Sequence, residues 1–191
     1  MGAAMRGSTF LVTILIALAA LGGGCTDAAN LLSATNAYRA THQAPALVWN
    51  SSLAADSRSW AAGLAANGCG LVHSPQIAWP DGYSENLYAL WVSSGPPAAT
   101  CTPGAVSWYS EVQYYNFAAA KAFTQNWPPY NNRTVGHFTA LVWKASGQLG
   151  CGVATGTTSA YYCKAVVCRY RAQSGNIATD SFFAANVLPP I

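Results

Sequence analysis

Four side chains that could bind a metal ion or move a proton stand out because their residue types are scarce in this chain. His73 and His137 are two of its three histidines, and Glu85 and Glu111 are its only glutamates. Each glutamate lies among aromatic and apolar neighbours, where a carboxylate needs a partner if it is buried. Imidazole is a natural partner. The third histidine, His42, looks incidental.

Two imidazoles can share one divalent cation, with zinc favoured, while nearby carboxylates orient the rings or accept protons from bound water. The metalloprotease pattern of two histidines one helical turn apart is absent. His73 and His137 therefore meet only if the fold brings them together. In the alternative interpretation, each histidine hydrogen-bonds a carboxylate simply to satisfy a polar core.

Ser74 and Ser84 lie in the same region and could act as nucleophiles with a histidine as base. The Gly-x-Ser-x-Gly pattern of a nucleophile elbow is absent from the chain. Serines beside histidine or glutamate are more often caps or turn formers.

The elements that must position these residues begin with helices. Apolar residues at three-to-four spacing over 30–68 predict two helices, separated near Pro45 and 49–51. Ser51 or Ser52 is expected to cap the second helix, and Gly68 to end it.

The chain changes character after a loop over 93–104 that is rich in proline and small residues. A third helix is predicted over 105–121. Short runs rich in valine, threonine and aromatic residues then predict strands at 138–143, 150–154, 161–170 and 182–187. Helices followed by closely spaced strands predict an α+β layered domain with an antiparallel sheet.

The first 25 residues have the features of a signal peptide: Arg6, an apolar stretch over 10–21, and small residues at 22–24. A membrane anchor would need about 20 consecutive apolar residues, so no integral membrane segment is expected. Lipid attachment at Cys25 is a further alternative, but the preceding leucine lies one place too far upstream. We therefore predict a secreted, extracellular, monomeric protein whose single domain spans 26–191.

Thiols oxidise in an exported chain, so the six cysteines predict disulfides. A leader cut after Cys25 would leave one thiol unpaired, whereas a cut before it allows three bridges, whose pairing the sequence leaves open. A zinc finger is excluded because Cys163 and Cys168 lack companion ligands at finger spacing.

The formal net charge is +3 and only 8% of the residues are charged. No stretch concentrates lysine and arginine, so we expect no nucleic-acid partner. Two sequons, at Asn50 and Asn132, predict N-glycosylation.

Several segments, in this order, resemble the signature blocks of the CAP superfamily (cysteine-rich secretory, antigen five and pathogenesis-related proteins) over about residues 30 to 187. The matching segments are Asn36-Ala37-Tyr38-Arg39, Leu47-Val48-Trp49-Asn50, Ser84-Glu85-Asn86-Leu87-Tyr88, 136–143, Leu149-Gly150-Cys151-Gly152, Val167-Cys168-Arg169-Tyr170 and Gly175-Asn176-Ile177. The chain departs from the pattern at Ala140, where glutamine is usual, and at Ser84, where glycine is usual.

The resemblance implies a three-layer α-β-α sandwich with a central cleft. In that cleft His73 and His137 would bind zinc or another divalent cation weakly, with Glu85 and Glu111 as supporting carboxylates. The resemblance also suggests disulfides Cys151–Cys168 and Cys69–Cys163, which would leave Cys101 to pair with Cys25 or to remain free.

Some family members bind sterols through an aromatic loop before the second histidine, or fatty acids between helices. This chain has aromatic residues in the corresponding segment, and we expect these to contact such a ligand: Tyr114, Tyr115, Phe117, Trp127 and Tyr130. The alternative is ordinary packing, because aromatics at helical spacing usually face a core.

These observations favour a secreted CAP protein that binds a sterol or fatty acid in a defence or pathogenesis-related role. One alternative is a zinc-dependent hydrolase, such as a protease, with Glu85 or Glu111 as base. Another is an interaction protein whose cleft is only structural.

Overall fold

The computed structural model describes residues 24–75, 83–120, 124–125, 133–172 and 180–191 of the chain. The helices are α1 (Ala28–Thr41), α2 (Ser51–Ala66), α3 (Thr102–Tyr109), the 3-10 helix η1 (Ser110–Tyr114), α4 (Gly136–Val142) and α5 (Asp180–Asn186). The strands are β1 (Val48–Trp49), β2 (Tyr83–Val92), β3 (Thr124–Gln125), β4 (Arg133–Thr134), β5 (Ser146–Thr157) and β6 (Tyr162–Ala172).

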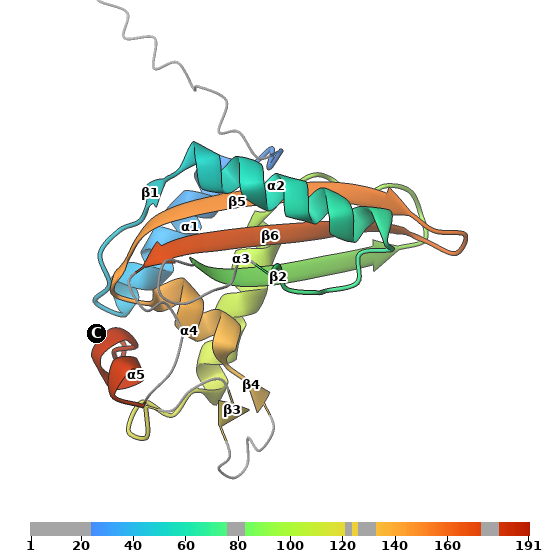
Figure 1. Cartoon of the computed structure of the whole chain (residues 1–191). Coiled ribbons are helices and arrows are strands. Elements are labelled where there is room, and N and C mark those ends of the chain that lie inside the picture. The colour runs from blue at the N-terminus through green and yellow to red at the C-terminus, as the bar shows by residue number, and fades with distance from the viewer. Residues whose placement is uncertain (1–23, 76–82, 121–123, 126–132, 173–179) are drawn as a thin grey trace, which may run out of the picture.

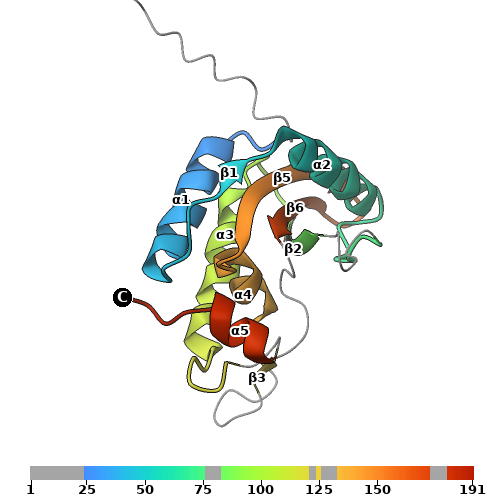
Figure 2. The ribbon, with the colours of Figure 1, turned by 60° about the vertical axis from the view of Figure 1, so that its left-hand side comes forward.

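The expected α+β sandwich is confirmed. A four-stranded sheet has the order β1-β5-β6-β2, and β3 and β4 form a small separate pair. The long strands β5, β6 and β2 are antiparallel, as predicted, whereas β1 runs parallel to β5. Helix α2 covers one face of the sheet, while α1, α3 and α4 lie on the other (Figures 1 and 2).

Strand β6 divides the hydrophobic core into two halves because successive side chains of a strand point to opposite faces. Val166 and Tyr170 pack with the larger cluster that includes residues of α1, α3 and α4. Ala165 and Val167 pack with Ala61 and Leu64 of α2 in the smaller cluster. The same alternation directs the functional side chains of the neighbouring strand β2.

The first two predicted helices are confirmed, although the cap of α2 differs from the expectation. Asn50, not Ser51 or Ser52, is the N-cap, and its side chain accepts a hydrogen bond from Leu53 N at 3.0 Å. Gly68 follows α2 with φ of +75°, a left-handed conformation that glycine adopts without steric cost.

Two of the predicted strands are wrong. The run 138–143 lies in α4, and 182–187 lies mostly in α5. All residues from Phe138 to Val142 are buried, including the polar Thr139, so this short run has no exposed face to reveal its period. In α5, Phe183 and Val187 are both buried, at the four-residue spacing of one helical face. The third helix is also shorter than predicted, since α3 ends at Tyr109 and η1 follows.

A buried arginine fixes α1 against the segment that joins α4 to β5. Arg39 is fully buried and donates four hydrogen bonds of 2.9 Å to the carbonyl oxygens of Pro45, Leu141, Trp143 and Ser146. Burial lowers the pKa of this guanidinium to about 10, which leaves it charged at neutral pH. Its fork of donors satisfies carbonyl groups at the end of α4 that the helix itself cannot pair.

Three disulfides brace the domain: Cys25–Cys101, Cys69–Cys163 and Cys151–Cys168. The second and third are the pairs that the family resemblance implied, and the first pairs the two cysteines that the sequence left open. A leader cut after Cys25 would remove the first bridge, whereas a cut before Cys25 would keep it. The position of the leader boundary stays a prediction.

No helix in the described part of the chain combines the length and the apolar character needed to span a membrane.

Helix α2 approaches the backbone of β5 closely because glycines face it. A β-carbon at Gly150 would lie 2.4 Å from Ala54 N, and one at Gly152 would lie 2.2 Å from Arg58 N. These contacts are with helix backbone, which cannot rotate away. The absence of side chains at these two positions therefore sets the separation between the helix and the sheet.

We predict that Gly152→Ala destabilises the fold by about 1–3 kcal/mol, because the added methyl group must push α2 from the sheet. Gly147→Ala in the same strand is the matched control, since a β-carbon there would meet nothing within 4 Å. Urea unfolding of both variants measures the difference. Equal stability of the two would show that α2 can shift without cost.

Candidate functional site

The first histidine–glutamate pair joins the segment after α2 to strand β2. Glu85 on β2 is buried, and its Oε1 lies 2.9 Å from Nδ1 of His73 and accepts a hydrogen bond from Ser74 N at 3.0 Å. Its Oε2 accepts from Ser74 Oγ at 2.8 Å and from Arg169 Nε at 3.0 Å. Four donors from two other segments therefore converge on this carboxylate.

The pKa of Glu85 reflects a competition between burial and hydrogen bonding. Burial raises the pKa, but the hydrogen bonds from His73, Ser74 and Arg169 outweigh it, so the pKa lies below its usual 4.5. Glu85 is thus ionised at neutral pH and balances the charge of Arg169.

The second pair joins η1 to α4. Oε1 of Glu111 lies 2.6 Å from Nδ1 of His137, and its Oε2 accepts hydrogen bonds from His137 N at 3.0 Å and Phe138 N at 3.1 Å. Glu111 therefore satisfies backbone N–H groups in the first turn of α4, which have no partner within the helix. The carboxylate of Glu111 therefore caps the N-terminal end of α4 and also orients the imidazole of His137, which belongs to that helix.

Asn86 connects the two pairs. It follows Glu85 on β2, is buried, and donates from Nδ2 to the carbonyl oxygen of His137 at 2.9 Å. Adjacent strand residues point to opposite faces, so β2 lies between the two pairs. The structure thus brings each histidine to its glutamate and both pairs to neighbouring residues of one strand. A single open groove shared by all four side chains stays a prediction.

The donor chemistry of the histidines fits a weak cation site. An ionised carboxylate can only accept hydrogen bonds, so Nδ1 is the donor in each pair, and Nε2 is the nitrogen left to bind a cation. The side chains of His73 and His137 are 53% and 30% exposed. Within the described ranges, no group of three or more His, Cys, Asp or Glu side chains could hold a metal ion. A site on His73 and His137 would therefore have two protein ligands, and their binding of one shared cation stays a prediction.

This geometry gives little support to hydrolysis. Catalytic zinc sites use three protein ligands, and the oxygens of both glutamates already accept hydrogen bonds from their own histidines and from backbone N–H groups. The lowered pKa of Glu85 also makes this carboxylate a poor base.

The described contacts of Ser74 do not support the serine-nucleophile hypothesis. Its hydroxyl donates to Glu85, and the ring nitrogen of His73 that makes a described bond also contacts Glu85. The serine therefore supports the carboxylate, and no described contact joins its hydroxyl to a histidine nitrogen. Ser84 Oγ is buried and has no partner among the described residues.

His42 is a structural residue of the core and not an incidental one. It is fully buried, with Nδ1 2.8 Å from the carbonyl oxygen of Leu188 and Nε2 3.2 Å from the hydroxyl of Tyr109. Both ring nitrogens are engaged, so this histidine is unavailable as a ligand. It holds the C-terminal segment against the end of α1.

The aromatic residues predicted to contact a lipid divide into two groups. Tyr115 is buried, and Phe117, which packs against Tyr115 and Phe138, belongs to the same aromatic cluster. Tyr114 is half-buried, with the guanidinium of Arg133 5.3 Å from its ring centroid. Trp127 and Tyr130, like the sequon at Asn132, lie outside the described residues. A lipid-binding role for this segment stays a prediction.

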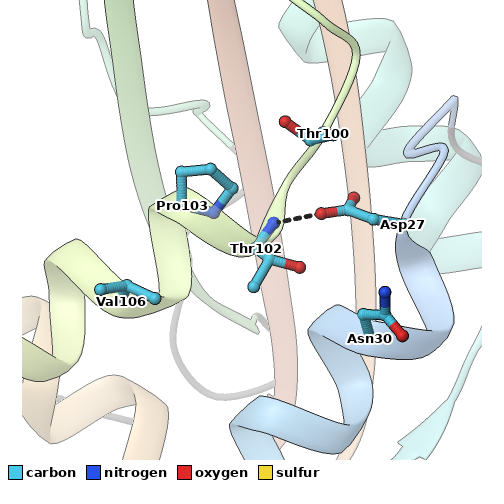
Figure 3. A pocket seen from close by; sticks show the side chains of 6 residues that line it. All are labelled: Asp27, Asn30, Thr100, Thr102, Pro103 and Val106. Carbon is cyan, nitrogen blue, oxygen red and sulfur yellow. Dashed lines mark hydrogen bonds between the residues drawn. The ribbon is translucent and has the colours of Figure 1, made fainter.

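A separate pocket of about 630 Å³ lies between the N-terminal ends of α1 and α3 (Figure 3). Asp27 and Asn30 line it from one side, while Thr100 and three residues of α3 line it from the other: Thr102, Pro103 and Val106. Hydrogen bonds from Cys101 N and Thr102 N to Asp27 fix the rim. Burial raises the pKa of Asp27, but hydrogen bonds from Thr102 and Cys101 outweigh it and lower the pKa below 3.8, so Asp27 is ionised at neutral pH. The ammonium group of Lys164 lies on the same rim, where it donates to Thr100 O and Oγ1 at 2.9 Å.

Sequence reasoning assigned no role to Arg169 or Asn86, although both lie in segments that carried the family resemblance. Their importance comes from cross-strand register, which pairs Glu85 with Arg169. A single sequence does not reveal that register.

An α-β-α sandwich in which two histidine–glutamate pairs flank an edge strand defines the class of this protein. The model of the cysteine-rich secretory protein family, CAP, matches residues 32–170, and the chain belongs to this family. Human Golgi-associated plant pathogenesis-related protein 1 is 34% identical over 84% of this chain and 91% of its own length.

The Repressed by EFG1 protein 1 of Candida albicans is 30% identical over 86% of this chain, but the match spans only 54% of the fungal protein. The crystal structure of NaASP2 with Zn²⁺ is 21% identical, covers 88% of each chain and has a TM-score of 0.55, which is a likeness of fold.

We predict that Glu85→Gln lowers stability at neutral pH by about 3 kcal/mol, because Arg169 loses its buried counter-charge. The folded-state pKa of Glu85 is lowered, so its contribution is present above about 4.5 and is lost as the pH falls through the folded-state value. The variant should therefore lose less stability than the wild type between about pH 7 and about pH 3.

Urea unfolding at both pH values measures this effect. Lys144→Gln, at an exposed charged residue outside this site, is the control and should change stability by no more than about 0.5 kcal/mol. Parallel pH dependence in the wild type and Glu85→Gln would contradict the prediction.

Proposed function

We propose that this chain is a secreted protein that binds an apolar ligand, a sterol or fatty acid, in a defence or pathogenesis-related role, and that it holds a divalent cation weakly. The pocket between α1 and α3 is the observation that carries the proposal. Its volume lies within the range of about 300–1,000 Å³ that suits small-molecule ligands. The proposed secretion has support from the three disulfides, which persist in oxidising compartments.

The lining of this pocket favours a neutral ligand. Val106 is 51% exposed and offers an apolar wall beside Pro103, where a ligand would remove apolar surface from water. The ionised carboxylate of Asp27 is balanced by Lys164, whose three N–H donors are all bonded to Ala98 and Thr100, so the rim offers no unpaired cation to the carboxylate of a fatty acid. A sterol has a hydroxyl group that can hydrogen-bond to such a rim, so we favour a sterol over a fatty acid here.

The proposed cation site consists of His73 and His137, each oriented by its glutamate. A bound divalent cation would supply positive charge and a Lewis acid to this edge of the sheet. The relative NaASP2 has been crystallised with Zn²⁺, which supports testing zinc first. With two histidine ligands, we propose a structural or ligand-orienting role for the cation and no hydrolysis.

We expect Val106→Asp to weaken sterol binding at least about tenfold, because a carboxylate in the apolar wall must be desolvated by the ligand. A radiolabelled-sterol binding assay on the secreted protein measures this. Val48→Asp is the matched control, since Val48 is 68% exposed on β1, away from the pocket.

Trp127→Ala with Tyr130→Ala, tested in the same assay, separates the two locations. Loss of binding in this variant with normal binding by Val106→Asp would place the ligand at the aromatic segment. Normal binding by both variants would contradict both locations.

Zinc binding measured by calorimetry should disappear in His137→Ala and weaken about 10- to 100-fold in Glu111→Gln, which keeps the ligand but loses the carboxylate that orients it. Acidification should weaken binding by the wild type because protons compete with the metal for the ring nitrogens. Wild-type affinity in His137→Ala would remove this residue from the site.

A further inference from the structure

A second, smaller pocket lies under the outer edge of α2, on the face of the sheet opposite to α1 and α3. Its volume is about 260 Å³, and it is lined by Asp56, Ser59 and Trp60 of α2, Tyr83 of β2 and Arg169 of β6. Helix α2 packs on the backbone of β5 at Gly150 and Gly152. Toward β2 the facing residues are the large side chains of Tyr83 and Arg169, and the pocket opens between them and the helix.

Arg169 supplies a buried charged group to this pocket. Its side chain is 3% exposed, its Nε donates to Glu85, and its guanidinium lies 4.8 Å from the ring centroid of Tyr83. A guanidinium has five N–H donors, and the contacts described for Arg169 use only the one on Nε. Arg169 also lines the pocket, where the N–H groups of its guanidinium can donate hydrogen bonds to an acceptor group of a ligand.

The charge balance of the pocket argues against an anionic ligand. The ionised Glu85 neutralises Arg169, and the exposed carboxylate of Asp56 adds a negative charge. Among the residues that line the pocket, no unpaired cation remains to offset this charge for a phosphate, sulfate or carboxylate. The exposed Arg171 lies opposite Tyr83 on β6 but does not line the pocket. A neutral ligand that both donates and accepts hydrogen bonds would suit Arg169, Asp56 and the hydroxyl of Ser59 together.

The aromatic side chains add a flat apolar surface. Trp60 is half-buried, and its indole N–H donates to the carbonyl oxygen of Val72 at 2.9 Å, which fixes the ring. Tyr83 is also half-buried and is held by its stacking with Arg169. Rigid aromatic rings beside fixed polar groups bind molecules that have one apolar face and a polar rim. A sugar ring has this character, with C–H groups on one face and hydroxyls around its edge.

We propose that this pocket binds one neutral hexose residue, either a free sugar or the terminal unit of a glycan. Trp60 and Tyr83 contact the ring face, while Arg169 and Asp56 bind hydroxyl groups from opposite sides. The volume of about 260 Å³ lies just below the usual range for small-molecule pockets, which limits the buried part to about one ring. This site shares no lining residue with the proposed apolar-ligand pocket, and it adjoins the proposed cation site because Arg169 donates to Glu85.

The test uses the full protein secreted into a bacterial periplasm, where it can form its disulfides without carrying glycans of its own. Glucose, mannose, galactose and N-acetylglucosamine are the probes, with inorganic phosphate and sulfate as anionic competitors. Saturation-transfer NMR detects binding, and calorimetry gives the affinity. We expect at least one of the four sugars to bind and neither anion to compete.

Asp56→Ala combined with Ser59→Ala should weaken sugar binding about tenfold or more, because ligand hydroxyls lose their partners. Both residues are exposed on α2, so the variant should fold, and circular dichroism checks this. Ser107→Ala, at an exposed serine of α3, is the matched control and should bind like the wild type. Val106→Asp should also retain sugar binding, whatever its effect on sterol.

Three results would overturn the proposal. They are the absence of binding by all four sugars, unchanged affinity in the double variant, and competition by phosphate or sulfate at the same site. The last result would identify the pocket as an anion site. If the protein does not bind sterol, the sugar-binding proposal is unaffected, because the two pockets share no lining residue.

Discussion

The arrangement of the candidate functional site depends on the hydrogen bonds that the carboxylate of Glu85 accepts. Glu85 lies on the edge strand β2, and it accepts hydrogen bonds from the segment that follows α2 and from β6. A buried charge is tolerated only where donors surround it, so the three segments must meet in this one arrangement. The position of His73 and the burial of Arg169 both follow from it, and so does one wall of the pocket under α2.

Two other polar groups, the buried Arg39 and the half-buried Glu111, position the opposite side of the site in the same way. The guanidinium of Arg39 satisfies carbonyl groups where α4 ends, and Glu111 satisfies N–H groups where α4 begins. Helix α4 is only seven residues long, and a helix of that length is not stable by itself in water. The side chains at its two ends, together with burial of Phe138 and Leu141, therefore hold His137 in place.

Much of this arrangement could be predicted from the sequence, because local signals and the family resemblance agreed. The helices at 28–41 and 51–66, the long strands β5 and β6 and the two histidine–glutamate pairs were all expected. The runs that form α4 and α5 were mistaken for strands because short apolar segments buried on all sides have no readable period. The strand β2 was missed because its polar residues Ser84, Glu85 and Asn86 hide the usual alternation.

Some features could not have been predicted from one sequence for a different reason. The role of Arg169 depends on which residue of β2 lies opposite it, and the role of His42 depends on a C-terminal segment that returns to α1. Both are long-range pairings whose partners are fixed only when the whole sheet is assembled. Asn50 is a more local case, since a sequon and an N-cap use the same residue and the sequence suggested only the first.

Helix α2 packs directly on the glycines of β5, and this close packing limits the mobility of His73. Helix and strand are in backbone contact, so they must move as one rigid body. The segment that follows α2 is fixed at Cys69 by the disulfide to Cys163, and again at Ser74 by its hydrogen bonds to Glu85. His73 lies between these two fixed residues, so its imidazole is already oriented before any ligand binds. Little conformational entropy then remains to be lost on binding.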